Sequence, residues 1–198
     1  MKRATTTPVR RRLAIDVAGY ATLARRVRSP NRDARPPGMP IDLVVVHGIS
    51  LPPGEFGGES IARLFTNTLD SNAHPSFAAI AELRVSAHFL IRRDGELVQF
   101  VACNERAWHA GVSSWKGREG CNDFSIGIEL EGTDDQPYAA AQYTMVARLV
   151  RALKRVYPIT DVVGHSDIAP GRKTDPGPAF DWARFARLTA RRVREIAP

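Results

Sequence analysis

Residues 41–50 read IDLVVVHGIS and carry the strongest strand signal of the chain. The segment alternates at first and then becomes a continuous apolar run, which is typical of a central strand buried on both faces. His47 ends this run and Gly48 follows it. We therefore expect a buried strand that presents an imidazole at its end.

Further helix and strand patterns follow this segment along the chain. An Asp-Gly pair at residues 94–95 separates two apolar runs and predicts a β-hairpin, because glycine supplies the positive φ that a tight turn needs. Other segments show apolar residues at helical or alternating spacing. We expect helices over 60–69, 139–157 and 181–196, a hairpin of 85–92 and 96–101, and strands over 125–131 and 161–164. These elements predict an α/β fold with a single mixed β-sheet flanked by helices.

Composition places the chain among globular proteins and gives its charge a clear location. The 198 residues are 43% hydrophobic and 25% charged, which favours one domain with a real core. The net charge is +7, but residues 1–35 hold ten Lys or Arg and two Asp, a charge of +8, which leaves −1 for residues 36–198. A folded body without positive excess argues against a nucleic-acid binder.

The start of the chain and its prolines predict where regular structure is scarce. We expect residues 1–14 to form a basic, disordered extension and residues 15–198 to form the domain. The first twelve residues, MKRATTTPVRRR, are not followed by the apolar segment of a signal peptide, so we expect a cytoplasmic protein. Residues 29–40 hold four prolines and predict an extended connection with little regular structure.

Two further observations concern membranes and thiols. The chain has no apolar run long enough for a transmembrane helix, so we expect no membrane partner. Its two cysteines, Cys103 and Cys121, are too few for a disulfide framework. We expect both to be buried small residues or free thiols.

Two histidines and an aspartate form a candidate metal site. His47 ends the valine-rich strand, His165 follows the predicted strand 161–164, and Asp175 lies ten residues further on. Two imidazoles and one carboxylate suit zinc and leave a fourth coordination position open, as in catalytic sites. The spacing of these three residues does not by itself bring them together, as two ligands on one turn of a helix would be. The alternative is therefore three separate surface or hydrogen-bonded residues.

Glu129 and Lys173 are candidates for chemistry beside such a site. Glu129 lies within the apolar alternation of SIGIELE, residues 125–131, where a buried carboxylate is costly unless it is paired. It is either a general base that points into a cleft or a solvent-facing residue, as we expect Glu131 to be. Lys173 precedes Asp175 by two residues, so in an extended loop both point the same way and the ammonium could face an oxyanion. The alternative is an ordinary exposed lysine.

Four segments of the chain, in order, resemble one known family. They are VVVHGISLPPGEFGG (44–58), LRVSAHFLIRRDGELVQFV (83–101), RAWHAGVSSWKGREGCNDFSIGIELEGTD (106–134) and GHSDIAPGRKTDPGPAFDWARF (164–185). They are similar to AmpD-type 1,6-anhydro-N-acetylmuramyl-L-alanine amidases. These belong to a zinc amidase superfamily that also includes phage lysozyme-type amidases and peptidoglycan recognition proteins. The resemblance covers roughly residues 17–188 and implies the amidase fold of that superfamily.

The resemblance also implies roles for particular residues. It makes His47, His165 and Asp175 the ligands of one zinc ion per chain, Glu129 the catalytic carboxylate and Lys173 the catalytic lysine. Three further residues are implied to lie near the substrate: Arg84, Trp108 and His109. For Trp108, both stacking on the sugar and packing in the core stay open.

The implied reaction is hydrolysis of the amide between N-acetylmuramic acid and L-alanine. The implied substrate is a 1,6-anhydromuropeptide released during wall turnover, so the enzyme would act in peptidoglycan recycling. The alternatives are an exported amidase that acts on intact peptidoglycan, and a non-catalytic module that binds peptidoglycan.

Two residues depart from the family pattern. Gly48 stands where the family usually has asparagine after the first ligand, and Gly120 stands where it has arginine. Both positions are expected to contact substrate rather than perform chemistry. The departures leave the reaction type intact and bear on affinity and substrate preference.

Overall fold

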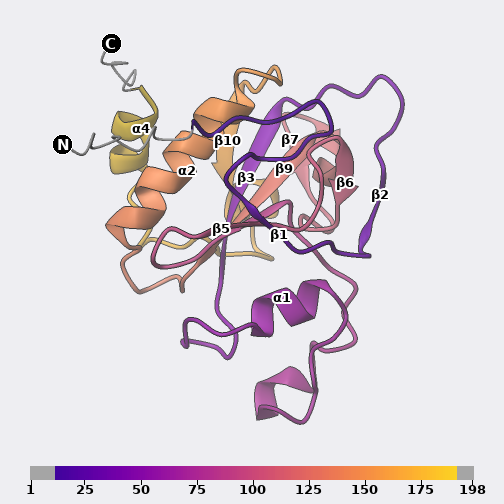
Figure 1. Cartoon of the computed structure of the whole chain (residues 1–198), viewed down its shortest axis with the longest axis vertical. Helices are drawn as coiled ribbons and strands as arrows, with labels where there is room; N and C mark the ends of the chain where they lie inside the picture. Colours follow the sequence, from indigo (N-terminus) through magenta and orange to yellow (C-terminus); the bar gives the residue numbers. More distant parts are fainter. Residues whose placement is uncertain (1–11, 191–198) are drawn as a thin grey trace, which may run out of the picture.

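The computed structural model describes residues 12–190 (Figure 1). Within this range the chain forms four α-helices and two short 3₁₀ turns. Their bounds are α1 Ser60–Phe65, α2 Ala140–Leu153, α3 His165–Ile168, α4 Trp182–Ala190, η1 Pro75–Phe77 and η2 Cys121–Asp123. Most of the predicted N-terminal extension and the last residues of the predicted closing helix lie outside the described residues.

A six-stranded sheet forms the centre of the molecule, in the order β1-β5-β4-β9-β3-β10. Strands β4, β9, β3 and β10 run parallel, and β5 is antiparallel to β4. The strand bounds are β1 Arg25–Arg26, β5 Leu97–Gln99, β4 Phe89–Ile91, β9 Ser125–Glu131, β3 Leu43–Ile49 and β10 Asp161–Gly164. The predicted mixed sheet and α/β class are confirmed.

Two short antiparallel ribbons lie outside this sheet. They pair β2 Arg32–Ala34 with β6 Glu105–Ala107, and β7 Ser114–Trp115 with β8 Arg118–Glu119. The proline-rich connection over 29–40 therefore contains one short strand that the sequence did not indicate. Its partner β6 lies some seventy residues away along the chain, so no local pattern announces the pairing.

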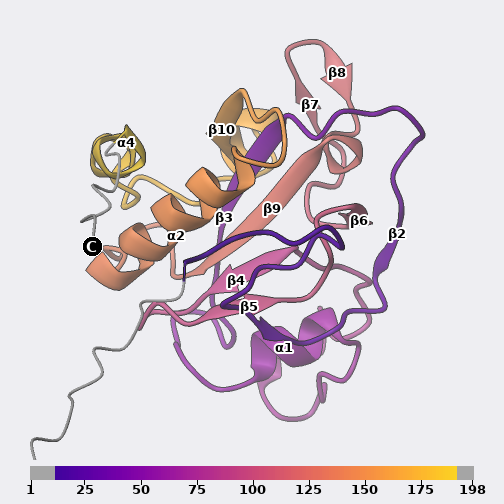
Figure 2. The same cartoon turned by 45° about the horizontal axis from the view of Figure 1, so that its top comes forward.

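Helices cover both faces of the sheet (Figure 2). Alternate residues of the two central strands, such as Val44 and Ile128, pack with Leu149 of α2 on one face. On the other face, Leu90 packs with residues of α1 in a second cluster, and Leu43 and Val45 pack in a third. Because side chains alternate along a strand, the residues in step with Leu43 and Val45 point away from α2.

Strands β9 and β10 have the predicted bounds, whereas helices α1 and α2 and the hairpin strands are shorter than predicted. Helix α1 ends at Phe65, because Asn67 adopts a φ of 59°, the left-handed conformation that often follows a helix. The predicted hairpin is confirmed as β4 and β5, and Gly95 in its turn has a φ of 89°. At the N-terminal side, Leu13 is 3% exposed and packs in the cluster beneath α2. The packed domain thus includes a residue before the predicted start at residue 15.

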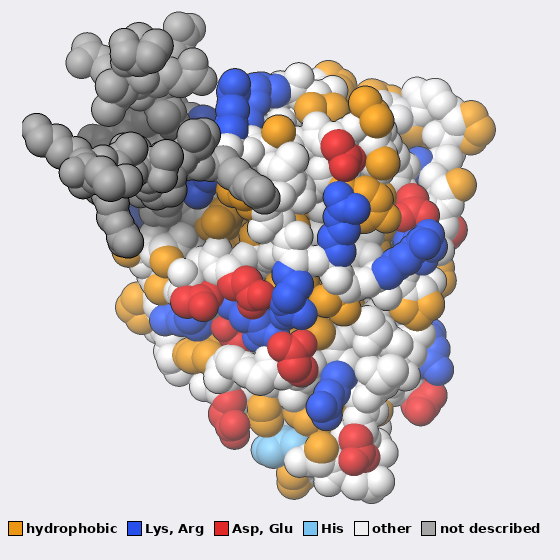
Figure 3. All heavy atoms as spheres, in the orientation of Figure 1, with side chains coloured by type: hydrophobic (Ala, Val, Ile, Leu, Met, Phe, Trp, Pro, Cys, Tyr) orange, Lys and Arg blue, Asp and Glu red, His pale blue; other side chains and the backbone are white. Residues whose placement is uncertain are grey.

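Three other sequence expectations can be compared with the structure. Cys103 and Cys121 are buried and unpaired, as predicted. Within residues 12–190, no helix has both the length and the apolar character needed to cross a bilayer. On the face that Figure 3 shows, acidic and basic side chains lie among one another, in line with the near-neutral charge of residues 36–198.

Candidate metal and catalytic centre

The register of two parallel strands places His47 beside Glu129. These residues are direct partners in the pairing of β3 with β9, and both lie on the face of the sheet opposite α2. Strand β10 runs parallel to β3 and ends at Gly164, so His165 emerges at the same edge. Carboxyl ends of parallel strands are a common place for binding sites, and here they bring together residues far apart in the sequence.

His47, His165 and Asp175 converge within hydrogen-bond distance of one another. The Nδ1 atoms of the two histidines are 2.9 Å apart, and Oδ2 of Asp175 lies 3.2 Å from the first and 3.1 Å from the second. Both rings are buried, and the aspartate is partly buried. Of the two readings that the sequence allowed, a cluster of ligands is the one that the geometry favours over three separate residues.

The charge states at this cluster suit a cation. Burial lowers the pKa of His47 to about 4, so its imidazole is neutral near pH 7, the form that binds metals. Burial by itself would raise the pKa of Asp175, but hydrogen bonds to His165 and His47 hold it below its ordinary range. A neutral imidazole and an ionised carboxylate that point to one place fit a metal ion such as zinc.

Glu129 has a buried oxygen without a partner. Its side chain is 9% exposed, and among the described residues Oε2 has no hydrogen-bond partner. Burial raises the pKa of Glu129 well above its ordinary value, the charge of Asp175 adds to this, and Lys173 opposes it. An unsatisfied buried carboxyl group is costly to the fold, so this position is better explained by chemistry than by stability.

Lys173 is exposed and lies close enough to the same cluster to act on its charges. Its positive charge acts on both Glu129 and His47, lowering the pKa of each. The expectation that Lys173 and Asp175 point the same way stays a prediction.

Glu131 is not the solvent-facing residue that the alternation predicted. It is 2% exposed, and its carboxylate accepts hydrogen bonds from the backbone N–H of Gly57 (2.6 Å) and of Arg93 (3.2 Å). Arg92 lies 3.5 Å away and balances its charge. The prediction was wrong because the loop after β3 and the start of the hairpin turn cover this end of β9.

The outer nitrogens of both histidines have partners on one short segment. His47 Nε2 lies 2.9 Å from Nδ1 of His109, and His165 Nε2 lies 3.2 Å from the carbonyl oxygen of Ala110. The ring of His109 lies on Gly127 of β9, where a Cβ atom would come within 2.5 Å of it. The sequence singled out His109 as a residue that lines the cleft, and the structure places its ring against His47.

Arg84 and Trp108 are less closely tied to the centre. Arg84 is exposed and its guanidinium bonds Glu82 at 3.3 Å. Trp108 is partly buried and its indole hydrogen-bonds Asp33. Within residues 12–190, the hydrogen bonds of these two side chains go to residues other than the three candidate ligands. The contacts of the three candidate ligands therefore give no support to a role for Arg84 or Trp108 in substrate binding, and that role stays a proposal.

A tyrosine and a glycine shape the loop that carries Asp175. The hydroxyl of Tyr138 donates to the carbonyl of Pro176 at 2.9 Å, and its ring lies against Gly132. A Cβ atom at Gly48 would come within 2.4 Å of the Tyr138 hydroxyl oxygen. The sequence singled out Gly48 as a departure from the family but gave no sign of this contact, because Tyr138 lies ninety residues further along the chain.

The fold and the site together define a class of protein. The family described as N-acetylmuramoyl-L-alanine amidase matches residues 37–178, and the chain belongs to this family. It is thus an amidase, as the resemblance implied. The similarity is distributed over nearly the whole described chain rather than confined to the cluster of ligands.

Within this family, the chain is similar to proteins named 1,6-anhydro-N-acetylmuramyl-L-alanine amidase AmpD. It is 62% identical to that of Escherichia coli (strain K12) over 175 residues, which cover 87% of this chain and 96% of that protein. It is 51% identical to that of Haemophilus influenzae over 170 residues, which cover 84% and 92% respectively. The resemblance to AmpD-type amidases is confirmed.

Solved structures agree with this assignment. A crystal structure of a selenomethionine derivative of AmpD has a TM-score of 0.85 and 63% identity, over 86% of this chain and 97% of that chain. AmiD of E. coli was solved with the substrate anhydro-N-acetylmuramic acid-L-Ala-D-γ-Glu-L-Lys. It has a TM-score of 0.56 and 29% identity, over 88% of this chain and 65% of that chain.

Proposed function

We propose that this amidase hydrolyses the amide between 1,6-anhydro-N-acetylmuramic acid and L-alanine in muropeptides, as a zinc enzyme of peptidoglycan recycling. The observation that carries the proposal is the convergence of His47 Nδ1, His165 Nδ1 and Asp175 Oδ2 at the edge of the sheet. The substrate is inferred from relatives of 51–63% identity whose names specify the anhydro form.

The donor set of the centre fits zinc. His47, His165 and Asp175 would hold the ion, and the unpartnered oxygen of Glu129 lies beside them, on the register partner of His47. When bound, zinc supplies a Lewis acid that polarises the scissile carbonyl. Three protein ligands are the number found in catalytic rather than structural zinc sites.

The residues of this chain would divide the proton and charge transfers between them. The raised pKa of Glu129 makes it a base that can take a proton from the attacking water and then give it to the leaving amine. Lys173 would place its positive charge beside the oxyanion that develops on the carbonyl. Arg84, Trp108 and His109 are the residues that the family resemblance proposes near the substrate.

Two alternatives make different predictions. An exported amidase would cleave intact peptidoglycan. The chain is also similar to a relative whose name does not specify the anhydro form, the N-acetylmuramoyl-L-alanine amidase AmiD of E. coli, at 39% identity over 130 residues. A non-catalytic module would be expected to lack a ligand or the base, but all four side chains are present here. The cytoplasmic location expected from the sequence stays a prediction.

One experiment separates these alternatives. The purified protein is incubated with an anhydromuropeptide and, in parallel, with intact sacculi, each with and without a chelator, and the products are read by mass spectrometry. We expect release of the peptide from the anhydromuropeptide, loss of that release with chelator, and far slower release from sacculi. Faster release from sacculi would favour the exported amidase, and no release from either substrate would favour the binding module.

A further inference from the structure

Both candidate histidine ligands receive their outer contacts from two consecutive residues. His109 provides its ring Nδ1 to His47 Nε2 at 2.9 Å, and Ala110 provides its carbonyl oxygen to His165 Nε2 at 3.2 Å. Each contact fixes the rotation of one imidazole about its bond to the chain. The orientation of both rings therefore depends on where this dipeptide lies.

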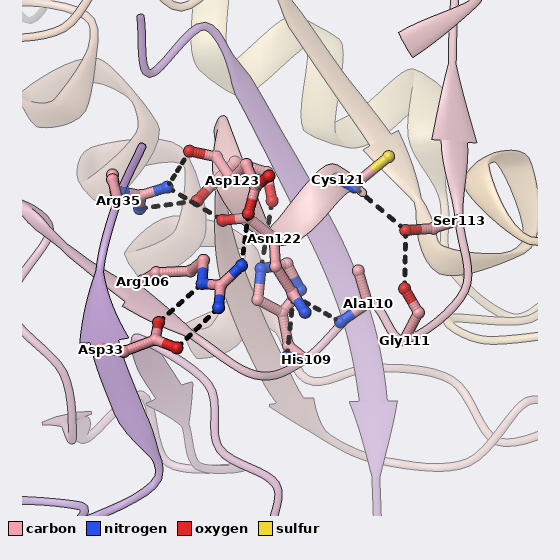
Figure 4. A network of polar contacts seen from close by, with 11 residues as sticks. Asp33, Arg35, Arg106, His109, Ala110, Gly111, Ser113, Cys121, Asn122 and Asp123 are labelled. Carbon is pink, nitrogen blue, oxygen red and sulfur yellow. Dashed lines mark hydrogen bonds and ion pairs between the residues drawn. The ribbon is translucent and has the colours of Figure 1, made fainter. Parts of the chain in front are cut away.

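One side-chain oxygen binds both backbone N–H groups of the dipeptide (Figure 4), while Arg172 donates to the Ala110 carbonyl oxygen at 2.7 Å. Oδ1 of Asn122 accepts a hydrogen bond from the backbone N–H of His109 (3.0 Å) and another from that of Ala110 (2.9 Å). The η2 turn that carries Asn122 is itself anchored. Arg35 donates to the carbonyl of Asn122 at 3.0 Å, and Arg106 bonds the side chain of the following residue at 2.6 Å.

The hydrogen positions that these contacts require agree with one another. A histidine that binds a metal through Nδ1 carries its hydrogen on Nε2, so His47 and His165 must each donate outward. The carbonyl of Ala110 can only accept, as this requires. His109 must accept at Nδ1, so its own hydrogen lies on Nε2, which is 3.1 Å from the hydroxyl oxygen of Ser125, an available acceptor.

We propose that Asn122 is a positioning residue of the metal centre, which orients both histidine ligands at once through the dipeptide His109–Ala110. The inference rests on the proposed zinc site and deepens it. Outer contacts of this kind typically change metal affinity or activity by about 10–100-fold when they are removed. Asn122 touches neither ligand, so its effect is expected on the affinity for zinc and not on the presence of the ligands.

The test measures zinc affinity in full-length variants by competition with a chromogenic chelator, together with the melting temperature of the metal-free protein. Asn122→Ala removes the acceptor, and we expect zinc to bind about 10-fold more weakly or worse. Asn122→Asp keeps an acceptor oxygen at the same place, and we expect it to restore the affinity to within about threefold of the parent, because the two backbone hydrogen bonds can form again.

Asn31→Ala is the matched control. Asn31 is buried, and its amide bonds the carbonyl of Val85 (2.7 Å) and the side chain of Asn67 (2.8 Å), away from the histidines. We expect this variant to melt at a lower temperature than the parent and to bind zinc as tightly. Should Asn122→Ala fail to fold, His109→Phe carries the test, because it keeps a ring of similar shape and removes the acceptor for His47.

The outcomes distinguish this inference from the proposed function. A parent protein without affinity for zinc would overturn the metal site, and the inference with it. If the parent binds zinc and Asn122→Ala binds it equally well, the inference alone is overturned. Equal losses of affinity in Asn122→Ala and Asn31→Ala would also overturn it, since the effect would then be one of general stability. For His109→Phe, an unchanged affinity has the same meaning.

Discussion

Glu129 and Glu131 lie two residues apart on the same side of β9, and their buried carboxylates have opposite surroundings. Glu131 accepts two backbone hydrogen bonds and has Arg92 near it, whereas Oε2 of Glu129 has no hydrogen-bond partner among the described residues. One carboxylate thus belongs to the hydrogen-bonded scaffold, and the other is the base that we propose. On this one strand, we therefore expect Glu131 to contribute to stability and Glu129 to contribute to catalysis.

Substitution of the two glutamates should separate these roles. We expect Glu129→Gln to lower turnover by about 10²-fold or more, because the amide cannot take a proton. Zinc content should stay at the level of the parent, and the melting temperature should stay equal or rise, since an unsatisfied buried carboxyl group is replaced. We expect Glu131→Ala to reduce the free energy of unfolding by about 3 kcal/mol, because it leaves two buried backbone donors without an acceptor and removes one of the carboxylates beside Arg92. Denaturant unfolding and a rate assay measure both effects.

The reverse pattern would overturn this division. A Glu131→Ala protein that is as stable as the parent but inactive, beside a Glu129→Gln protein that still turns over, would move the base to Glu131.

Metal removal is expected to abolish activity. We predict about one zinc per chain after mild purification, because two histidines and one carboxylate make a single catalytic set. Asp175→Ala should lose both metal and turnover, since it opens the coordination shell. Elemental analysis beside the rate assay checks this. Full activity in a protein with far less than one metal per chain would contradict the prediction.

Lys173 should matter for rate and not for metal. Lys173→Ala is expected to lower turnover by about 10²-fold, because a positive partner for the oxyanion is removed. Its zinc content should equal that of the parent. Lys116→Ala is the matched control: it removes another exposed lysine, whose ammonium bonds Asp161 at 2.9 Å, and it should leave turnover nearly unchanged. Similar losses in both variants would show that the effect is one of surface charge.

The thiol of Cys103 should be unreactive in the folded protein. The residue is fully buried, and burial raises its pKa from 9.0 to about 12. At pH 8 we expect a thiol reagent to label neither cysteine in the native protein and both after unfolding. Labelling of the native protein at the rate seen after unfolding would contradict the burial.

The same shift predicts a dependence of stability on pH. The folded state binds the Cys103 proton more tightly than the unfolded state, so stability is lost as pH rises above about 9. Between pH 8 and 10.5 this thiol should account for about 2 kcal/mol of lost stability. Unfolding curves of the parent and Cys103→Ala at both pH values measure the difference, and an identical pH dependence of the two proteins would refute it.

Local sequence patterns determined much of the fold and the centre. The valine run before His47 predicts its strand, and the alternation around Glu129 predicts a strand of the right bounds. The fate of Glu131 could not be predicted, because a loop and a hairpin turn from elsewhere cover it. The contact of His165 with Ala110 spans 55 residues and uses a backbone carbonyl, which no residue type announces. Asn122 could not be identified from the sequence either, because its side chain binds backbone N–H groups, which no residue type indicates.

Because Gly48 has no side chain, the hydroxyl of Tyr138 occupies the space beside it, and positions 48 and 138 have to be mutated together. Any larger residue at 48 meets the hydroxyl oxygen of Tyr138 at 2.4 Å, whereas the next nearest atoms lie at 3.6 and 3.7 Å, which is ordinary contact. In every variant with a side chain at position 48 alone, the Tyr138 hydroxyl must move away from the carbonyl of Pro176. Pairing each substitution with Tyr138→Phe removes that obstacle, so the effects of the two changes should be strongly non-additive.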